Sequence, residues 1–238
     1  MVNRRDFAFL AFSVVALALL VGLGMWQVQR LQWKEGLIAQ MTEQAASAPL
    51  ALSEIEARQA AGEDVEFMRA TTKGRFMHDK ELFVFTTEDG EMGWKVVTPL
   101  ETDDGSAVLI DRGFIPYDLK NPAARADNLP AGTVRVTGAV RPYSSVRAPF
   151  VPDNDAGANV WHWWALPAMA EAAGLERAAP FILQAEPRPG DPPWPRASTP
   201  DPAAIPNRHL GYAVTWFGLA AMLVAVNGLY LLRRRKPA

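Results

Sequence analysis

The sequence has 238 residues, a formal net charge of -2 and 49% hydrophobic residues, which is enough for one compact domain with further segments outside it. The charge balance leaves no basic footprint, so we expect no nucleic-acid partner. The chain contains no cysteine, which excludes disulfide frameworks, thiolate metal sites and cysteine nucleophiles.

Two uncharged apolar segments, 7–25 and 210–232, stand near the two ends of the sequence. Each is long enough to cross a hydrocarbon core of about 30 Å at about 1.5 Å per residue, so we predict two transmembrane helices. The first segment could also be an export signal cleaved after 16–18. Cleavage there would leave an apolar new terminus, so a retained anchor is the better interpretation.

Basic residues flank the two segments on their outer sides. Arg4 and Arg5 precede the first, and a run of three arginines and a lysine follows the second. By the positive-inside rule, the stub 1–6 and the tail 233–238 stay in the cytoplasm, and 26–209 lies across the membrane. The remaining charge of this middle part is negative, which fits an exported domain.

The first helix is predicted to continue beyond the bilayer, because Trp26, Trp33 and Leu37 recur at helical spacing. Trp26 fits the aromatic belt at the membrane interface. Arg30 and Trp33 could contact lipid headgroups or the folded domain, although plain anchoring is the interpretation that we favour.

The middle of the chain is predicted to be rich in β-strands. Seven short segments are rich in β-branched and aromatic residues and are bounded by turn residues: 67–76, 82–87, 94–100, 107–116, 133–142, 160–164 and 181–185. The dipeptides 89–90 and 104–105, both Asp-Gly, are turn signals between neighbouring segments, so antiparallel hairpins are expected.

Short helices and one connector complete the predicted domain. A capping-box pattern at Ser53 opens a helix that ends near Gly62, and 165–173 forms another. The proline-rich segment 186–206 can be neither strand nor helix and is predicted to be an extended connector. The predicted fold is therefore an α+β membrane protein. Two transmembrane helices bracket an exported antiparallel β-rich domain, barrel- or sandwich-like, with short helices.

The predicted domain carries little that resembles catalytic machinery. No phosphate-binding glycine loop, zinc-ligand spacing or nucleophile motif is present, so we predict that the protein is not an enzyme, with a membrane enzyme as the open alternative. Asp111 and Arg112 end an apolar strand, where a bidentate contact between arginine and carboxylate is plausible. A structural ion pair is the favoured interpretation there, and a partner contact is the other.

One face of the second apolar helix carries polar and aromatic residues. His209 and Trp216 lie on this face, and Ala213, Ala220, Leu223 and Asn227 share it at helical spacing. Trp216 lies about 10 Å deeper than His209 at about 1.5 Å per residue, and the alanines between them leave room for a flat amphipathic ring. Imidazole is the usual axial ligand of haem iron, but a histidine snorkelling at the interface fits the spacing equally well.

Polar and small residues also suggest how the two helices pair. Asn227 and Ser13 lie at similar depths in their spans, which predicts a hydrogen bond across the hairpin. Ala18 and Gly22 supply a small-residue face that would allow close approach.

Two motifs at the membrane segments resemble those of a known family. Residues 23–30, LGMWQVQR, followed by Trp33 and Lys34, resemble the LGxWQxxRxxWK entry motif of the surfeit locus protein 1 family. Residues 207–218, NRHLGYAVTWFG, resemble the second signature of that family, NxHLxYAxTWFG. The likeness extends over nearly the whole chain, in order and with the two-span layout.

Two internal segments, 93–100 and 110–116, resemble internal signatures of the same family. The sequence departs from the family pattern at Phe114, where tryptophan is common, and at Arg208, where a polar uncharged residue is usual. Neither departure changes His209.

The resemblance implies an assembly factor for cytochrome c oxidase that binds haem a and aids its insertion into subunit I. It carries the haem-binding roles of the family to His209, as axial ligand of the haem iron, and to Trp216. It also implies subunit I and the haem a synthase as partners, besides membrane lipid. The expected location is the bacterial inner membrane, with both termini cytoplasmic and the main domain periplasmic. The alternative is a scaffold that stabilises oxidase subunits without touching haem.

Overall fold

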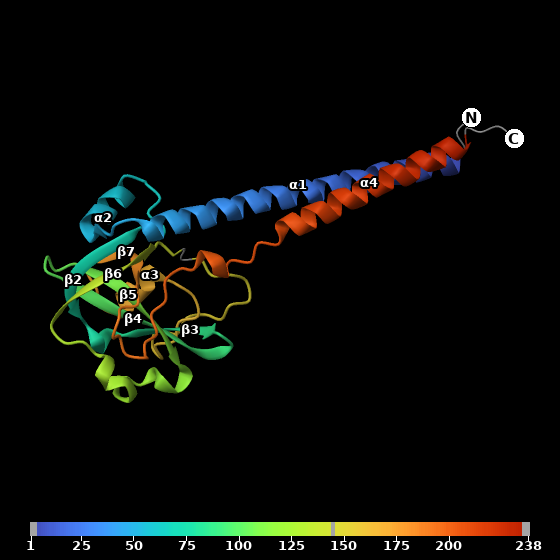
Figure 1. Ribbon diagram of the computed structural model, residues 1–238. Coiled ribbons are helices and arrows are strands. Elements are labelled where there is room, and N and C mark those ends of the chain that lie inside the picture. Colours follow the sequence, from blue (N-terminus) through green and yellow to red (C-terminus); the bar gives the residue numbers. More distant parts are fainter. Residues whose placement is uncertain (1–3, 144–145, 235–238) are drawn as a thin grey trace. The chain divides into compact units, whose positions relative to one another are not determined.

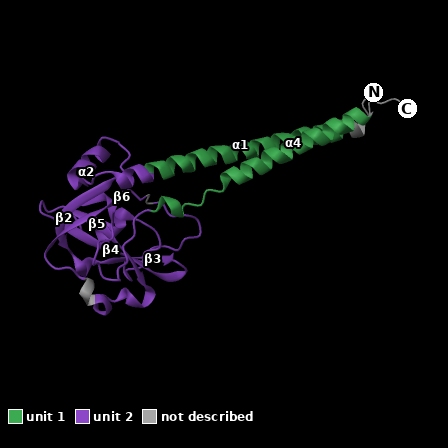
Figure 2. Cartoon of the chain, in the orientation of Figure 1, with its two compact units in different colours: residues 1–40, 201–238 green, residues 41–200 purple. Residues whose placement is uncertain are grey.

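The computed structural model describes residues 4–143 and 146–234 (Figure 1). Its α-helices are α1 (Arg4–Ala46), α2 (Leu52–Ala60), α3 (Leu166–Ala172) and α4 (His209–Arg234). The chain divides into two compact units, one of residues 1–40 and 201–238 and the other of residues 41–200 (Figure 2).

The first unit contains α4 and most of α1. Both helices are long and apolar enough to cross a membrane, by length and composition. They run antiparallel, since the ring of Phe9 near the start of α1 lies 5.1 Å from the ring of Tyr230 near the end of α4. The predicted pair of long apolar helices is confirmed, as is the continuation of the first helix past the apolar segment, because α1 is unbroken to Ala46.

The second unit is built on a β-barrel. Its strands are β1 (Leu50–Ala51), β2 (Arg69–Phe76), β3 (Leu82–Glu88), β4 (Glu91–Thr102), β5 (Ala107–Pro116), β6 (Thr133–Arg141) and β7 (Ala178–Ala185). The sheet order is β1-β2-β6-β7-β5-β4-β3, and an additional pairing of β2 with β4 closes five of these strands into a barrel. Strands β1 and β3 extend the sheet beyond the closed ring.

The barrel has a Greek-key order. If its five strands β2, β4, β5, β6 and β7 are numbered along the chain, their order around the barrel is 1-2-3-5-4-1, the arrangement of OB-type barrels. The pairings are antiparallel, as predicted, except that β5 pairs with β7 and β1 pairs with β2 in parallel. The barrel-like, β-rich domain is therefore confirmed, with a mixed sheet. The fold alone assigns no function.

Closure of the barrel depends on a bend in β2. Gly74 pairs both with Val134 of β6 and with Thr102 of β4, so β2 passes from one neighbour to the other at this residue. A Cβ atom at Gly74 would lie 2.2 Å from the carbonyl oxygen of Glu101. Only glycine allows the two backbones to approach this closely.

The strands at the centre of the barrel are buried on both faces. Val108 and Ile110 of β5 point into the barrel interior, where Phe181 and Leu183 of β7 join them. Leu109 points to the opposite face, where it belongs to a second cluster built on residues of α3 and on Trp161. This double burial explains why β5 reads as a continuous apolar run.

Two local predictions are wrong. Residues 160–164 form no strand, because Trp161 makes a single bridge to Val84 and the Asn154 side chain then binds the backbone N–H of His162. The short helix expected near Ser53 is present as α2, but the capping box is wrong, because the N-cap residue is Ala51, two residues earlier, and it provides no side-chain cap. Ala51 pairs with β2, so α2 leaves directly from a strand.

Candidate functional site

The face of α4 that carries His209 and Trp216 is the side of that helix that faces α1. Ala213 and Ala220 are buried, and His209 and Trp216 are half-buried, while Val214 beside them is exposed. The opposing side of α1 includes Gly24 and Gln27, both buried. A Cβ atom at Gly24 would lie only 2.7 Å from the ring of Phe217, so the two helices are in close contact at this level.

His209 is held by a side chain that sequence reasoning passed over. Its Nδ1 atom lies 2.6 Å from Oε1 of Gln27, whose side chain comes from the facing helix. An amide oxygen only accepts, so in this hydrogen bond Nδ1 carries the proton. The neutral imidazole then presents the lone pair of Nε2, which is the arrangement of a metal-ligating histidine oriented by a second residue. Gln27 lies within the first family-like motif, and its place in that motif is the signal that could have drawn attention to it.

Trp216 carries an unused donor. Its indole Nε1 is buried and has no hydrogen-bond partner within the described residues. The sequence predicted that Ala213 and Ala220 leave room for a flat ring beside this indole. The structure differs, because these small residues instead let α4 pack closely on α1, as small residues do between membrane helices. The ligand atom of His209 fits an axial role, but a porphyrin cannot lie flat along the alanines in this arrangement.

Two cationic side chains, Arg30 and Lys34, lie on α1 in the turns that follow Gln27. The Arg30 guanidinium lies 3.9 Å from the centroid of the Trp33 ring, a cation–π contact, and the Lys34 ammonium donates to the carbonyl of Pro206. Trp26 is exposed on the same helix. Arg30 and Lys34 therefore stand close to the start of α4, where acidic groups of a ligand or lipid would find positive charge.

The predicted hydrogen bond between Ser13 and Asn227 is not formed. Asn227 donates through Nδ2 to the carbonyl of Leu223 on its own helix, and its Oδ1 has no partner within the described residues. Both side chains instead line one groove of about 300 Å³ between the helices. Ala18 and Gly22 are exposed, and no atom lies within 4 Å of a Cβ built on Gly22, so they do not form the close contact that we expected.

Asp111 and Arg112 do not pair with each other. The Asp111 carboxylate is buried on β5, where it accepts a hydrogen bond of 2.9 Å from the backbone N–H of Gly113. Burial raises the pKa of this carboxyl. Arg112 points to a different cluster, so the two neighbours serve separate parts of the barrel.

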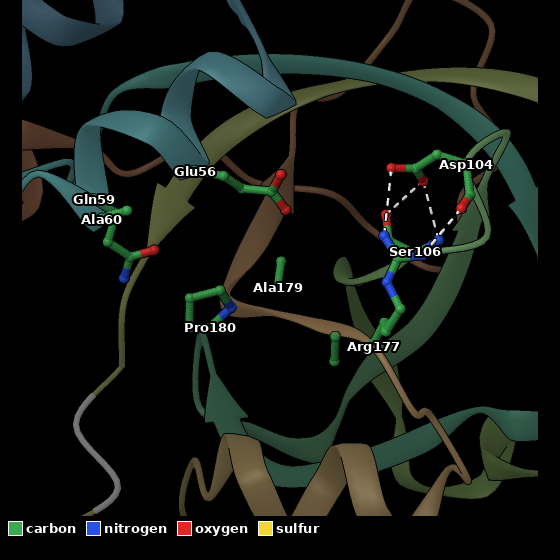
Figure 3. A pocket seen from close by; sticks show the side chains of 9 residues that line it. Glu56, Gln59, Ala60, Asp104, Ser106, Arg177, Ala179 and Pro180 are labelled. Atoms are coloured by element: carbon green, nitrogen blue, oxygen red, sulfur yellow. Dashed lines mark hydrogen bonds and ion pairs between the residues drawn. The ribbon is translucent and has the colours of Figure 1, made fainter.

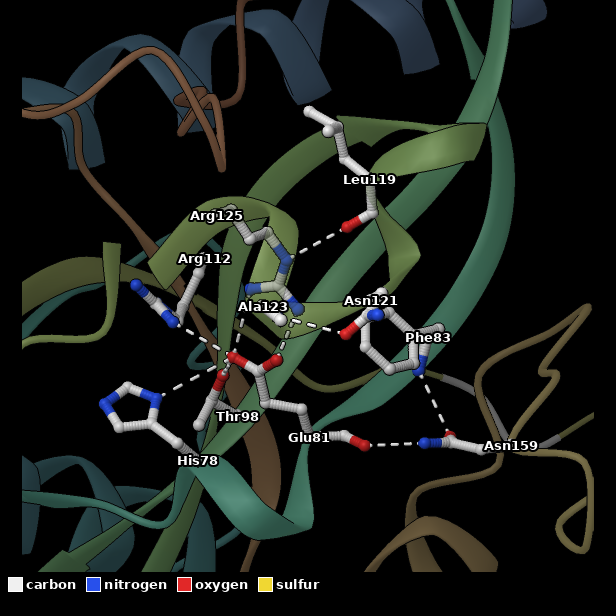
Figure 4. A network of polar contacts seen from close by, with 10 residues as sticks. All are labelled: His78, Glu81, Phe83, Thr98, Arg112, Leu119, Asn121, Ala123, Arg125 and Asn159. Carbon is white, nitrogen blue, oxygen red and sulfur yellow. Dashed lines mark hydrogen bonds and ion pairs between the residues drawn. The ribbon is translucent and has the colours of Figure 1, made fainter. Parts of the chain in front are cut away.

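A buried ionic cluster centred on Glu81 is the largest polar feature that sequence reasoning missed (Figure 4). The Glu81 side chain is only 2% exposed and pairs with the guanidinium groups of Arg125 and, at 3.1 Å, Arg112. Thr98 donates to the same carboxylate, and Nδ1 of His78 lies 3.7 Å away. In the sequence Glu81 stands in a polar run, HDKE, which reads as an exposed turn.

A cavity of about 600 Å³ lies beside α2 and the turn that joins β4 to β5 (Figure 3). Glu56 and Asp104 line it together with Arg177, which lies 3.9 Å from Asp104. Hydrogen bonds from Thr102 and Ser106 lower the pKa of Asp104, while burial raises the pKa of Glu56. Asp104 is thus committed to its own turn. Across the described residues, no group of three or more His, Asp or Glu side chains is placed to hold a metal ion.

Comparison with known proteins identifies the family to which the chain belongs. The sequence matches the SURF1 family over residues 14–221. It is 33% identical over 239 residues to surfeit locus protein 1 of Homo sapiens, covering 92% of this chain and 76% of the human protein. It is 32% identical over 230 residues to surfeit locus protein 1 of Takifugu rubripes, covering 88% and 91%. A SURF1-like protein of Monosiga brevicollis is 34% identical over 227 residues, covering 90% and 83%.

Two long apolar helices and a barrel unit placed between them in the sequence define a membrane protein with two candidate spans. The chain belongs to the SURF1 family, as its motifs indicated. Members of this family are cytochrome oxidase assembly factors and not enzymes, which confirms the expectation that the chain has no catalytic activity.

Proposed function

We propose that this protein binds haem a and aids its insertion into subunit I of cytochrome c oxidase. The observation that supports this most directly is the hydrogen bond between His209 and Gln27, which leaves Nε2 of the imidazole as a ligand atom at the end of α4. Haem a is the cargo, and its iron would accept this nitrogen as an axial ligand. A single histidine ligand suits a carrier, because the cargo must be released to the oxidase.

Other residues of the helix pair have supporting roles in this proposal. Trp216, with its unpartnered Nε1, would contact the edge of the porphyrin rather than lie under its plane, since the alanines are covered by α1. Arg30 and Lys34 would attract the acidic side chains of the haem at the same end of α4. Trp26, which is exposed, would anchor α1 at the lipid interface.

The proposal includes a location for each part of the chain. Helix segments 7–25 and 210–232 would cross the bacterial inner membrane, with 1–6 and 233–238 in the cytoplasm, because the basic flanks favour that side. The part 26–209, with the barrel and the connector 186–206, would then lie in the periplasm. Subunit I and the haem a synthase would be its partners, alongside membrane lipid.

The visible absorption spectrum of the purified full-length protein tests the ligand role. Protein from cells that make haem a is expected to carry haem, and His209→Ala to carry less than about a tenth as much, since one axial ligand is worth more than about 1.4 kcal/mol, the free energy of a tenfold change. His162→Gln is the matched control, because His162 lies in the barrel near Phe85 and is expected to leave haem content unchanged. Equal haem in wild type and His209→Ala would refute the ligand role.

Gln27 offers a second and more specific test. Gln27→Leu removes the acceptor of the Nδ1 proton, and the loss of such an orienting partner lowers metal affinity by about 10–100-fold. Gln27→Glu keeps an acceptor oxygen and is expected to restore most of the haem content. The Soret and α bands of both variants report whether the same nitrogen still binds the iron. A Gln27→Leu protein with wild-type spectrum and affinity would contradict the positioning role.

A scaffold function without haem is the second candidate. It is favoured by one observation, that the alanines expected to line an open slot are buried against α1. If this candidate is correct, His209→Ala supports normal amounts of assembled, haem-containing oxidase in cells. The haem-carrier proposal instead predicts that subunit I accumulates without haem in that variant.

A further inference from the structure

The barrel unit contains a second cavity, of about 550 Å³, between strands β2 and β6 and the proline-rich segment that follows β7. Its volume falls in the range of small-molecule sites, which is about 300–1,000 Å³. Four arginines from different elements line it: Arg69, Arg112, Arg135 and Arg188. Phe76, Val136 and several prolines supply apolar walls. The cavity therefore combines positive charge with apolar surface.

Three of these arginines are paired with nearby carboxylates, and one of them is Arg112, which contacts Glu81 at 3.1 Å. Arg69 makes a two-pronged contact with Glu186, at 2.7 and 2.8 Å, and Arg188 pairs with Asp191 at 3.0 Å. Arg135 differs from them, because it lines the cavity without any carboxylate partner in the part of the chain that the structure describes. The acidic groups of the cavity are thus already used, and the charge of Arg135 is left over.

The surroundings of Arg135 add to this positive charge. Arg135 lies directly opposite Lys73 in the pairing of β2 with β6, and Arg188 donates to the Arg135 carbonyl at 3.5 Å. Lys73 also has no acidic partner among the residues described. Like charges placed directly opposite each other across two strands are destabilising. An anion bound beside Arg135 would relieve this repulsion.

The inner wall of the cavity suits the apolar part of a ligand. Arg112 is 10% exposed there, and its guanidinium lies 5.0 Å from the centroid of the Phe76 ring. A guanidinium in such a partly dehydrated setting interacts more strongly with an acidic group than one in water. Arg112 is held in place by its contact with Glu81, so the wall is ordered before any ligand arrives.

We propose that this cavity is a binding site for an acidic group, carboxylate or phosphate, carried on an apolar body, and that Arg135 is its principal contact. The site is separate from the helix pair and does not depend on the proposed ligation by His209. Two molecules available to a membrane protein of this kind share that chemistry. One is an anionic phospholipid, and the other is a porphyrin with free carboxylates.

Calorimetric titration of the full-length protein in non-ionic detergent distinguishes these sources. The probes are a short-chain phosphatidic acid and metal-free deuteroporphyrin, each compared with a neutral or zwitterionic counterpart, phosphatidylcholine and the porphyrin dimethyl ester. A metal-free porphyrin has no iron that His209 could bind, so the difference between its affinity and that of its dimethyl ester reports on recognition of the carboxylates. At least one acidic probe is expected to bind about tenfold more tightly than its counterpart, and the one that does identifies the source.

Two charge-removing variants locate the binding. Arg135→Gln is expected to lower the affinity for the acidic probe by about tenfold or more, the effect of losing a hydrogen bond between charged groups. Lys73→Gln is the matched control, because it removes the opposing exposed cation, which does not line the cavity, and is expected to change affinity less than about twofold. Both variants relieve the like-charge pair, so thermal unfolding should show neither to be less stable than wild type.

Three results would overturn the proposal: no binding of either acidic probe, equal affinity for the neutral counterparts, or equal loss in Arg135→Gln and Lys73→Gln. The haem content of Arg135→Gln protein is a separate readout. If His209→Ala abolishes haem while Arg135→Gln leaves probe binding intact, the helix site stands and the cavity site fails. If Arg135→Gln loses the probe and His209→Ala keeps its haem, the reverse holds.

Discussion

The helix pair and the barrel use polar residues in opposite ways. In the helix pair, few polar side chains are buried, and several are left partly unsatisfied, such as Nε1 of Trp216 and Oδ1 of Asn227. In the barrel, the buried carboxylate of Glu81 is surrounded by two guanidinium groups and a hydroxyl donor. The barrel unit also contains buried atoms without a partner among the described residues, such as Nε1 of Trp163 and Oε1 of Gln184, so the contrast is between the surroundings of His209 and those of Glu81.

This difference shows where function and stability reside. A buried polar group without a partner costs free energy, so it persists where a ligand or partner completes it. A buried carboxylate whose two oxygens are both paired, as in Glu81, specifies the packing of the strands around it. The helix pair therefore has the character of a binding site, and the Glu81 cluster has the character of a structural centre.

The largest expected effect is on the barrel. Glu81→Gln removes the charge that compensates Arg125, whose side chain is 1% exposed, and also part of the compensation of Arg112. Breaking one partner of a buried pair costs about 3–5 kcal/mol, so the barrel is expected to lose most of its stability. Denaturant unfolding of the full-length protein, followed by near-ultraviolet circular dichroism, measures this loss.

Glu54→Gln is the control for that change. Glu54 pairs with Arg58 one turn along α2, and both side chains are more than a third exposed. Such a pair contributes about 0.3–0.5 kcal/mol, so the variant should be nearly as stable as wild type. If the two variants lose similar amounts of stability, the Glu81 cluster is not the structural centre of the barrel, and the contrast between the two units weakens.

The sequence predicted most of the barrel's elements but not its buried charges. Alternation and turn residues located β2 to β7, because these signals act over a few residues. The cluster joins Glu81 to Arg112 and Arg125, which are brought together only when the strands pair. Short-range patterns contain no information about such contacts. The strand predicted at 160–164 was wrong for the same reason, because contacts with Asn154 and with β3 determine the conformation of this segment.

For the helix pair, the sequence identified the buried face of α4 but not what covers it. Helical spacing placed His209 and Trp216 on one side correctly, because periodicity fixes which residues share a face. It did not show that α1 occupies that side, or that Gln27 reaches His209. The sequence assigned the close small-residue contact to Gly22, but Gly24 makes it. Two residues along a helix correspond to a rotation of about 200°, so the two glycines lie on different faces of α1.

An intermediate effect is expected on helix pairing. Gly24→Ala places a Cβ atom 2.7 Å from the Phe217 ring, which must move aside, and overpacking of this kind costs about 1–3 kcal/mol. Cysteines introduced at Ser13 and Asn227, which line the same groove, form a disulfide probe in a chain that has no other cysteine. Disulfide formation between them should slow several-fold in Gly24→Ala.

Gly22→Ala makes the same change where nothing lies within 4 Å of the new methyl group, so disulfide formation should be unaffected. Slowing in both variants would point to a general effect on the helix rather than on the contact. Asn227→Leu, tested by crosslinking at other positions, is expected to leave pairing unchanged, because Asn227 donates only within α4.

The smallest effect concerns the pH dependence of barrel stability. Burial raises the folded-state pKa of Asp111 above its unfolded value of about 3.8, so the folded protein binds this proton more tightly than the unfolded chain. The contribution of Asp111 to stability therefore falls as pH rises from 3.8 through the raised folded pKa. Asp111→Asn keeps an acceptor for the Gly113 N–H and removes the titration. Relative to wild type, the variant should gain stability as pH rises above about 3.8 and through the raised folded pKa.

Asp104 is the natural counterpart, because its pKa moves in the opposite direction. Hydrogen bonds from Thr102 and from Ser106 favour its charged form and lower its pKa. Its contribution to stability is present above the unfolded pKa and is lost as pH falls below about 3.8. Asp104→Asn should therefore remove stability at neutral pH but not in acid, whereas Asp111→Asn adds stability at neutral pH. If urea unfolding shows the same sign for both variants, burial does not dominate the pKa of Asp111, and the barrel compensates this carboxylate as it compensates that of Glu81.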